Sequence, residues 1–336
     1  MFEKFLAILL FFPISVYTTV QYTIIHWGKS HTLMMSEDAS SEKIKYDGKW
    51  GKAASLPTLR YEFGAALVND EIYVIGGVYL PTIYAATARV EAYNVKADTW
   101  REVASLPVVI HHPGVTSDGS YVYVIGGDGF KITPYNLAYR YDPRKDLWER
   151  LPDMPTKRGA LGLVALDGKI YAIGGAAYAS KFNTLEVYDT KTKKWETKKS
   201  MPTPREHLGI ATAGGKIYVL GGFMTDRFHS LRTVEVYDPK ADTWEESIPL
   251  PLSLSGFSAI GMHDKVYIFG GQQGVPVSGE THEYDTKNKV WSRMADLAFP
   301  RYALVSVAVG DTIHLLGGSK VVGGYEFAKD HEVFTP

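Results

Sequence analysis

One glutamate and three histidines are the residues of this chain whose types could support chemistry. Glu62, the adjacent His111 and His112, and His207 lie in short polar segments that precede apolar runs. Imidazole nitrogens and carboxylates bind metals, and the same groups serve as general acids and bases. Adjacent side chains on an extended chain point in different directions, so only one of His111 and His112 would face a shared site. We therefore assign no metal and no cofactor from the sequence, and expect these side chains to line a polar opening.

Composition excludes several other kinds of site. The chain of 336 residues has no cysteine, which excludes disulfides, thiolate metal ligands and thiol nucleophiles. Its 36 basic and 37 acidic residues give no positive field for a phosphate backbone, so nucleic acid is not an expected partner. No Ser-His-Asp order, phosphate-binding glycine loop or zinc signature is present in the sequence.

A Gly-Gly pair recurs through the chain and divides it into six similar units. Successive pairs are 50, 48, 47, 49 and 47 residues apart. They are Gly76-Gly77, Gly126-Gly127, Gly174-Gly175, Gly221-Gly222, Gly270-Gly271 and Gly317-Gly318. A period near 50 predicts radial repetition, because one such unit cannot bury its apolar faces alone.

Aromatic residues repeat at the same intervals in another part of the unit. The tryptophans of the repeats are Trp50, Trp100, Trp148, Trp195, Trp244 and Trp291. A tyrosine followed by Asp or Asn stands seven residues before each of the last five, at Tyr93, Tyr141, Tyr188, Tyr237 and Tyr284. We expect the glycines, tyrosines and tryptophans to be structural, with the aromatic rings packed against the adjacent unit.

Each unit is predicted to form four short antiparallel strands. In the fourth unit, apolar residues 209–213 and 216–220 flank Gly214-Gly215, which suits a tight hairpin turn. Residues 234–237 and 243–245 form a second pair, separated by turn-forming residues.

This pattern resembles the kelch repeat over about residues 45–336. The resemblance implies an all-β fold, a six-bladed β-propeller of four-stranded antiparallel blades. Two departures stand out: Asn94 replaces Asp in the first unit, and Val333-Phe334 stands where the last Tyr-Asp is expected. Because residues 45–54 form a lone fourth-strand element, we expect them to close the last blade, which carries Gly317-Gly318.

The resemblance also points to a ring of residues near the axis. In kelch adaptors that capture acidic peptides, the position two after a recurring arginine supplies ligand-binding side chains. Here that position is occupied by Glu62, His112, Ala160, His207, Gly256 and Ala303. The ring has no arginine, so capture of an acidic peptide in that way is not expected. The preceding arginines, Arg60, Arg158, Arg205 and Arg301, are expected to be structural, paired with backbone or carboxylate groups between blades.

A second set of loops follows the Gly-Gly pairs. Together with Glu62, His112 and His207, its candidate ligand-binding residues are Tyr79, Asp128, Lys131, Tyr178, Phe223, Arg227 and Gln272. Exposed aromatic residues among polar ones are typical of interface anchors. The alternative is that these aromatic rings pack onto their own loops.

The N-terminal region differs in composition from the repeats. Residues 1–4 precede residues 5–27, a run of 23 without Asp, Glu, Lys or Arg. As a helix this run would reach roughly 34 Å, enough to cross a hydrocarbon core of about 30 Å. We expect a transmembrane signal anchor followed by a polar linker at residues 28–44, with the propeller outside the cytoplasm. The alternative is a signal peptide, whose cleavage would leave a secreted or periplasmic protein.

Two functions remain open at this point. The first is a noncatalytic binding module for a protein or glycan, displayed from the membrane. The second is an exported sugar isomerase that resembles the kelch-type sialic acid mutarotases, with Glu62, His112 or His207 as acid and base. The mutarotases carry their catalytic region in insertions between blades, whereas no interval here exceeds 50 residues. Kelch copper radical oxidases need a Tyr-Cys crosslink, and the iron run of plant specifier proteins would need a histidine where this chain has Phe334.

Overall fold

The structure is a computed structural model that describes residues 46–79, 86–225, 228–323 and 326–336. The chain divides into two units, Met1–Ile44 and Lys45–Pro336, and the described residues belong to the second. The anchor predicted at residues 5–27 and the linker at 28–44 lie outside the described residues and stay predictions. Within the described ranges, no helix is long and apolar enough to span a bilayer.

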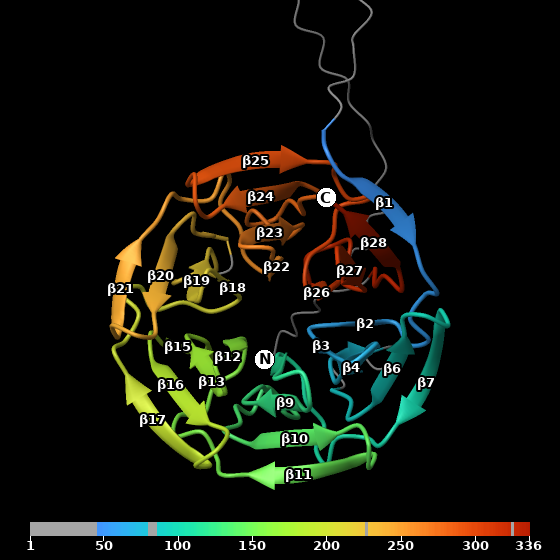
Figure 1. Ribbon diagram of the computed structural model, residues 1–336, viewed down its shortest axis with the longest axis vertical. Coiled ribbons are helices and arrows are strands. Elements are labelled where there is room, and N and C mark those ends of the chain that lie inside the picture. Colours follow the sequence, from blue (N-terminus) through green and yellow to red (C-terminus); the bar gives the residue numbers. More distant parts are fainter. Residues whose placement is uncertain (1–45, 80–85, 226–227, 324–325) are drawn as a thin grey trace, which may run out of the picture. The chain divides into compact units, whose positions relative to one another are not determined.

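Six four-stranded antiparallel sheets surround a central axis as blades, which confirms the predicted fold of the repeats (Figure 1). The first blade contains, from the axis outward, β3 (Gly64–Val68), β4 (Glu71–Ile75), β6 (Val90–Asn94) and β7 (Thr99–Val103). The second contains β8 (Gly114–Ser117), β9 (Val122–Ile125), β10 (Ala138–Asp142) and β11 (Leu147–Leu151). The third contains β12 (Gly162–Leu166), β13 (Lys169–Ile173), β16 (Leu185–Asp189) and β17 (Lys194–Lys198).

The remaining blades repeat this order. The fourth contains β18 (Gly209–Ala213), β19 (Lys216–Leu220), β20 (Val234–Asp238) and β21 (Thr243–Glu246). The fifth contains β22 (Ser258–Met262), β23 (Lys265–Phe269), β24 (Thr281–Asp285) and β25 (Val290–Met294). The sixth contains β26 (Val305–Val309), β27 (Thr312–Leu316), β28 (His331–Thr335) and β1 (Lys49–Lys52). Two short pairs lie outside the blades: β2 (Arg60–Tyr61) with β5 (Val78–Tyr79), and β14 (Ala176–Ala177) with β15 (Ser180–Lys181).

The apolar core lies between the blades rather than in one central mass. Each described core cluster joins side chains of two neighbouring blades, and the sixth blade shares one with the first. The innermost strands contact one another in a closed circle, with β26 against β3. This contact demands small residues: a Cβ added at Gly64 of β3 would lie 2.1 Å from a methyl carbon of Val115. The ring is therefore held by lateral packing of repeated units.

The Gly-Gly pairs allow the backbone of one blade to approach the next. The second glycine donates its N–H to the following blade, as from Gly77 to the Ile110 carbonyl at 2.9 Å. The first glycine has positive φ, and a Cβ at Gly126 would lie 2.5 Å from the Arg158 carbonyl oxygen. A side chain is therefore excluded at the Gly-Gly pair, both by the positive φ and by contact with the neighbouring blade.

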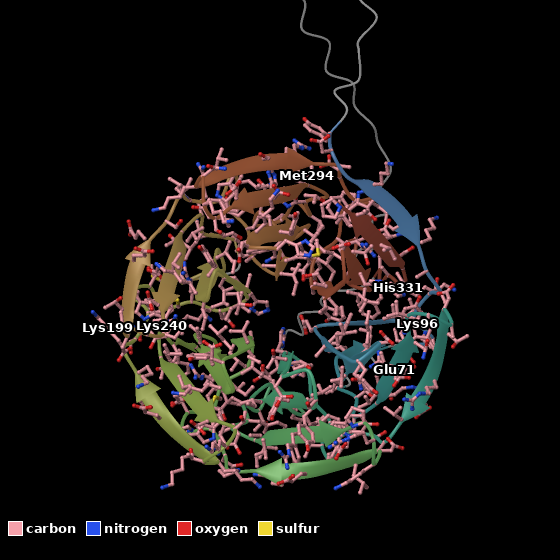
Figure 2. The ribbon with its side chains drawn as sticks, in the orientation of Figure 1. Glu71, Lys96, Lys199, Lys240, Met294 and His331 are labelled. Carbon is pink, nitrogen blue, oxygen red and sulfur yellow. The ribbon has the colours of Figure 1, made fainter. Side chains whose placement is uncertain are left out.

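Tryptophans join the outer edges of the blades. Each indole N–H donates to a carbonyl that follows the outermost strand of the preceding blade, at 2.7–3.3 Å. The pairs are Trp50 with Ala295, Trp100 with Ala54, Trp148 with Ala104, Trp195 with Pro152, Trp244 with Lys199 and Trp291 with Ile248. Lys199 lies at the outer rim of the molecule (Figure 2). The repeated Trp thus connects neighbouring blades around the circumference.

The sixth blade is assembled from both ends of the propeller sequence. β1 pairs antiparallel with β28, and Trp50 lies opposite Phe334. In the fourth blade the equivalent cross-strand pair is Tyr237 with Trp244. Phe334 therefore occupies the tyrosine position, and the alignment of the last Tyr-Asp with Val333-Phe334 is wrong by one residue. Phe334 still packs against the tryptophan as the tyrosines do, with the Phe334 and Trp50 ring centroids 4.8 Å apart.

Candidate functional site

The four recurring arginines are fully buried and paired with glutamates on the third strand of their own blade. Arg158 contacts Glu186 at 2.9 Å and Arg205 contacts Glu235 at 2.7 Å. The other pairs are Arg60 with Glu91 and Arg301 with Glu332. Each guanidinium also donates to backbone carbonyls of that blade. The arginines therefore have structural partners, within blades and not between them, and are not available to a ligand.

The second and fifth blades lack both members of this pair. Ile110 and Leu254 occupy the arginine position, and Tyr139 and His282 occupy the glutamate position. A buried arginine or glutamate without its partner would be an uncompensated charge. The absence of both partners from the same blades leaves no unpaired buried charge at these two positions.

The residue two after the arginine position forms a ring around the axis. Backbone N–H groups link neighbouring members, as from His112 to the Glu62 carbonyl at 2.9 Å and from His207 to the Ala160 carbonyl at 3.1 Å. The six residues, Glu62, His112, Ala160, His207, Gly256 and Ala303, all have φ between 49° and 57°. Because the two alanines share this φ, the scaffold imposes it, and the side chains at these positions are free to differ.

Three side chains of this ring meet at the mouth of the axial channel. His112 Nε2 lies 3.2 Å from Glu62 Oε1 and 3.1 Å from His207 Nε2. The two imidazole rings meet edge to face, with centroids 4.8 Å apart. Glu62, His112 and His207, chosen from the sequence, are thus neighbours in space.

Charged groups from the adjacent loops surround these three residues. Asp128 Oδ2 lies 3.6 Å from His112 Nδ1, and Glu206 Oε2 lies 3.4 Å from His207 Nδ1. Lys181, on β15, forms an ion pair with Glu206. His111 is buried, and its Nδ1 lies 2.7 Å from His112 Nδ1. We call Glu62, His111, His112, Asp128, Lys181, Glu206 and His207 the axial cluster.

The axial cluster shifts the pKa values of its members. Burial would raise the pKa of Glu62, but interactions with His112 and His111 outweigh burial and hold it well below its usual range. Burial also opposes ionisation of Glu206, yet His207 and Lys181 lower its pKa to about 2. The pKa of His207 is raised because Glu206 outweighs the effect of burial, whereas burial raises the pKa of Asp128. Carboxylates and imidazoles here stabilise one another and could hold a cation.

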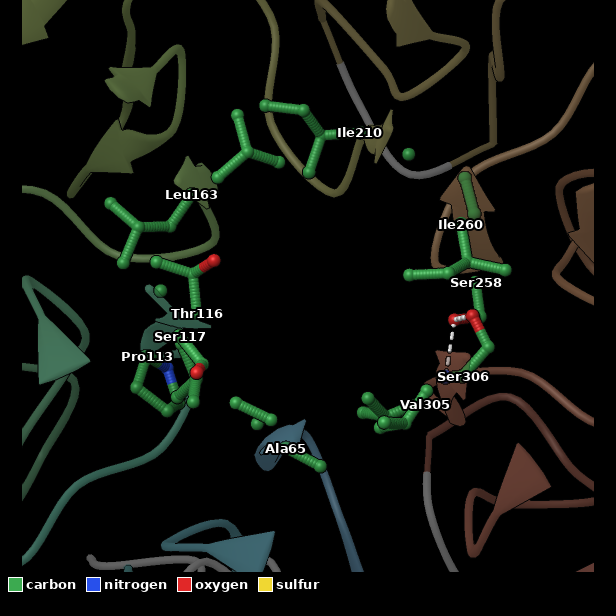
Figure 3. A pocket seen from close by; sticks show the side chains of 18 of the residues that line it. Ala65, Pro113, Thr116, Ser117, Leu163, Ile210, Ser258, Ile260, Val305 and Ser306 are labelled. Atoms are coloured by element: carbon green, nitrogen blue, oxygen red, sulfur yellow. Dashed lines mark hydrogen bonds between the residues drawn. The ribbon is translucent and has the colours of Figure 1, made fainter. Parts of the chain in front are cut away.

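The channel beneath the mouth differs in character. Figure 3 shows its wall, formed by side chains of the innermost strands, among them Leu163, Ile210 and Ile260. A hydrogen bond of 2.7 Å joins the hydroxyls of Ser258 and Ser306. The channel encloses about 420 Å³, and the mouth about 120 Å³. Titratable groups are therefore concentrated at the mouth.

The loops after the Gly-Gly pairs lie on the same face as the mouth. In each blade, the segment before the innermost strand bridges to the segment after the glycines, as between His111 and Asp128 and between Glu206 and Phe223. Phe223 is buried and stacks on His207, with centroids 5.1 Å apart. Gln272 is buried, and Tyr79 is partly exposed.

Two other candidates in these loops are exposed. Tyr178 is 77% exposed, and Lys131 lies on the surface with its ammonium 5.5 Å from the Phe130 ring. Arg227 lies outside the described residues. The sequence reasoning therefore named buried packing residues and exposed residues together, because their loop positions are equivalent.

Exposed apolar side chains gather in these loops to an extent that sequence reasoning missed. Phe130 is 66% exposed and Val275 67% exposed. The set comprises Phe130, Ile132, Tyr178, Met224, Phe228, Val275 and Val321, and we call it the apolar rim. The sequence did contain a signal, since large apolar residues stand two to six residues after five of the glycine pairs, in loops that also contain polar residues.

Comparison with known proteins agrees with the repeats and the blades. The family described as "Calicin, beta-propeller domain" matches residues 68–258, more than half of the chain, and the Kelch motif matches residues 253–298.

The chain belongs to the kelch β-propeller family.

This kelch propeller has curated relatives of greater length. It is 32% identical to Kelch-like protein terF of Aspergillus terreus over 201 residues, which are 50% of this chain and 43% of that protein. It is 36% identical to Kelch-like protein 36 of Bos taurus over 145 residues, 41% of this chain and 23% of that protein. Beta-scruin of Limulus polyphemus is 28% identical over 174 residues, 50% of this chain and 18% of that protein. The matches span less than half the length of each relative.

A solved structure shares the fold of the kelch propeller. "Structure of YjhT" superimposes with a TM-score of 0.73, covering 84% of this chain and 97% of that chain. The sequence identity is 17%, so the likeness concerns the fold alone.

Proposed function

We propose that this propeller binds a protein partner, without catalysis, through the face that carries the axial cluster and the apolar rim. Kelch-repeat propellers generally serve as protein-binding modules. The curated kelch relatives support a binding role here at the level of the domain, because only part of each relative is matched.

The apolar rim is the observation that carries this proposal. Its members come from the second to the sixth blade and surround a polar centre on one face. Several exposed aromatic and aliphatic side chains on one face are typical of interaction sites, where such side chains fill pockets of a partner. By contrast, the exposed apolar residues Leu147 and Val290 lie singly at the start of outermost strands.

The cavity at the mouth gives less support to a small-molecule ligand. It encloses about 120 Å³, less than the roughly 300–1,000 Å³ of common small-molecule sites. The channel beneath it encloses about 420 Å³, but no titratable side chain lines that channel. A glycan ligand and the sugar-isomerase alternative therefore gain no specific support from this site, although Glu62 and His207 could exchange protons.

Membrane display is part of the proposal and rests on the sequence. Residues 5–27 would hold the propeller at the membrane, with the propeller outside the cytoplasm and residues 28–44 as its tether. Protease protection of the full chain in sealed vesicles, with mass measurement of its N-terminus, distinguishes an anchored propeller from a cleaved and secreted one. A propeller protected on the cytoplasmic side would contradict the proposed orientation.

The binding face is tested with the full chain carrying a photocrosslinking residue at Tyr178, on the apolar rim. The matched control carries it at Leu147, which is 61% exposed but lies on β11. We expect a discrete crosslinked protein from position 178 only, and loss of that product in a Val275→Asp background but not in a Val290→Asp background. Equal crosslinking from both positions would contradict the proposed face.

A further inference from the structure

Three nitrogen and oxygen atoms at the axial mouth converge as metal ligands do. The atoms are Glu62 Oε1, His112 Nε2 and His207 Nε2, all within 4.8 Å of one another. Two of their separations are 3.2 and 3.1 Å. A tetrahedral zinc ion with bonds of about 2.0–2.1 Å requires ligand atoms roughly 3.3 Å apart. We propose that Glu62, His112 and His207 bind a divalent transition-metal ion, with Zn²⁺ the best match.

Proton accounting supports a cation between these atoms. His112 Nε2 faces both the Glu62 carboxylate and His207 Nε2. A single proton on His112 Nε2 can point toward one of these acceptors at a time, which leaves the other poorly satisfied. A metal ion accepts a lone pair from each of the three atoms at once. Its charge also offsets the concentration of carboxylates in the axial cluster.

The surrounding carboxylates stand where a zinc site needs them. A histidine ligand usually donates its second ring N–H to a carboxylate, which fixes its tautomer and orientation. His207 Nδ1 lies 3.4 Å from Glu206 Oε2, and His112 Nδ1 lies 2.7 Å from His111 Nδ1 and 3.6 Å from Asp128 Oδ2. Lys181 holds Glu206 in place through its ion pair. A proton on each Nδ1 would leave both Nε2 lone pairs directed at the shared position.

A second grouping, His111 with His112 and Asp128, also brings potential ligands together. Its two Nδ1 atoms are 2.7 Å apart, which is too close for two ligands of one ion and suits a hydrogen bond between the rings. His111 is therefore assigned to positioning His112, not to the metal. The expectation that the two adjacent histidines point in different directions is wrong: with φ of 49° at His112 the backbone is not extended, and both rings lie near Glu62.

The proposed site has an open coordination position. The other members of the ring are Ala160, Gly256 and Ala303, which offer no ligand side chain. Two histidines, one glutamate and a free position form a ligand set used by zinc sites that bind water or an external group. The site therefore suits an exchangeable fourth ligand, and its occupancy does not depend on the protein-binding proposal.

Titration of the untagged full chain with Zn²⁺ alone, followed by calorimetry, tests the site. We expect one Zn²⁺ per chain, at least about 100-fold weaker binding in His207→Ala and Glu62→Gln, and about 10- to 100-fold weaker binding in Glu206→Gln. The matched control is His263→Ala, because His263 is an exposed histidine 3.3 Å from Asp311 on a distant turn. Its affinity should equal that of the wild type.

Thermal unfolding separates loss of the metal from loss of the fold. Glu62→Gln preserves shape, so its metal-free Tm should stay near that of the wild type, whereas Zn²⁺ should raise Tm in the wild type and not in the variant. Co²⁺ substitution should give the strong visible absorption of a tetrahedral site in the wild type only. Absence of stoichiometric Zn²⁺ binding, or unchanged affinity in the double variant His112→Ala, His207→Ala, would overturn the proposal.

Discussion

Buried ion pairs are the residue-scale feature that most constrains the repeats. Arg205 is inaccessible to solvent, and its guanidinium contacts Glu235 as well as the Val219 and Thr233 carbonyls. Removing one partner of such a pair leaves the other buried and uncompensated. Replacing both partners is less costly than removing one. The second and fifth blades contain neither partner, as at Leu254 and His282 of the fifth blade.

The first prediction concerns this pair. We expect Arg205→Met to lower the free energy of unfolding by about 3–5 kcal/mol, because Glu235 becomes an unpaired buried charge. The double variant Arg205→Met, Glu235→Gln should recover part of this loss. Urea unfolding of the wild type and of both variants measures the difference. A double variant less stable than the single one would show that charge compensation is not the cause.

A second prediction concerns His331 in the sixth blade (Figure 2). Its Nδ1 lies 3.1 Å from the Ala54 carbonyl, which can only accept, so Nδ1 carries the proton and Nε2 accepts from His314 Nδ1 at 2.8 Å. Burial and then the charge of His314 lower the pKa of His331 to about 4. Protonation at Nε2 would therefore disrupt the hydrogen bond between His314 on β27 and His331 on β28.

The sign of the pH effect follows from that lowered pKa. The unfolded chain takes up a proton at His331 near pH 6.5, whereas the folded chain does so only near pH 4, so stability falls as pH drops through this window. The contribution is at most about 3 kcal/mol for a shift of this size. Unfolding free energies measured from pH 7 to 4 should fall more steeply in the wild type than in His331→Leu. Parallel curves would contradict the assignment.

At the residue scale, sequence reasoning could name side chains but not their partners. Glu62, His112 and His207 share one position in the repeat, so a common location follows from the repeat alone. Glu206 immediately precedes His207, and Lys181 comes from the β14–β15 hairpin, so their meeting depends on side-chain directions that the repeat does not specify. Phe223 was grouped with exposed loop residues, and the structure buries it against His207.

At the scale of elements, the period fixed most of the architecture. The Gly-Gly pair, the tyrosine and the tryptophan recur at constant spacing, and each has its own packing role. Together they are sufficient to predict four-stranded blades and their number. The short pairs β2–β5 and β14–β15 were not predicted, since strands of two residues carry no periodic pattern. The sequence alignment placed the Tyr-Asp position of the last blade one residue too early, at Val333-Phe334. No tyrosine marks that position, so only the pairing of β28 with β1 identifies Phe334 as the equivalent residue.

The third prediction concerns closure of the sixth blade by β1. Deleting the chain through Ala54 removes β1, the Trp50 packing against Phe334, and the carbonyl that accepts from Trp100. Trp50 is partly buried, so its loss costs less than the roughly 3–5 kcal/mol of a fully buried Trp, but the deletion also leaves β28 as an open edge. Calorimetry should show a sharply lower Tm than for a control that lacks only residues 1–44. Equal transitions would mean that β1 does not close the ring.

At the scale of the whole molecule, the ring has no structural beginning. Thr335 pairs with Lys49 across the β28–β1 ladder, just as Asp238 pairs with Thr243 across β20 and β21. Joining Pro336 directly to Tyr46 would place four residues between Thr335 and Lys49, the same number that separates Asp238 from Thr243. The existing break in the chain thus coincides with a hairpin present in every other blade.

This equivalence gives the fourth prediction, a circular permutant of residues 46–336. With Pro336 joined to Tyr46 and new termini between Gly214 and Gly215, we expect a folded propeller whose Tm stays close to that of the unpermuted residues 46–336. The new ends lie in a turn where added atoms would meet nothing within 4 Å, and every interblade contact is retained. The matched control places the ends between Tyr218 and Val219 inside β19, which would divide a buried strand and should prevent cooperative unfolding. If both permutants unfold alike, blade continuity does not determine stability, and the ring is held by contacts other than the ladders within each blade.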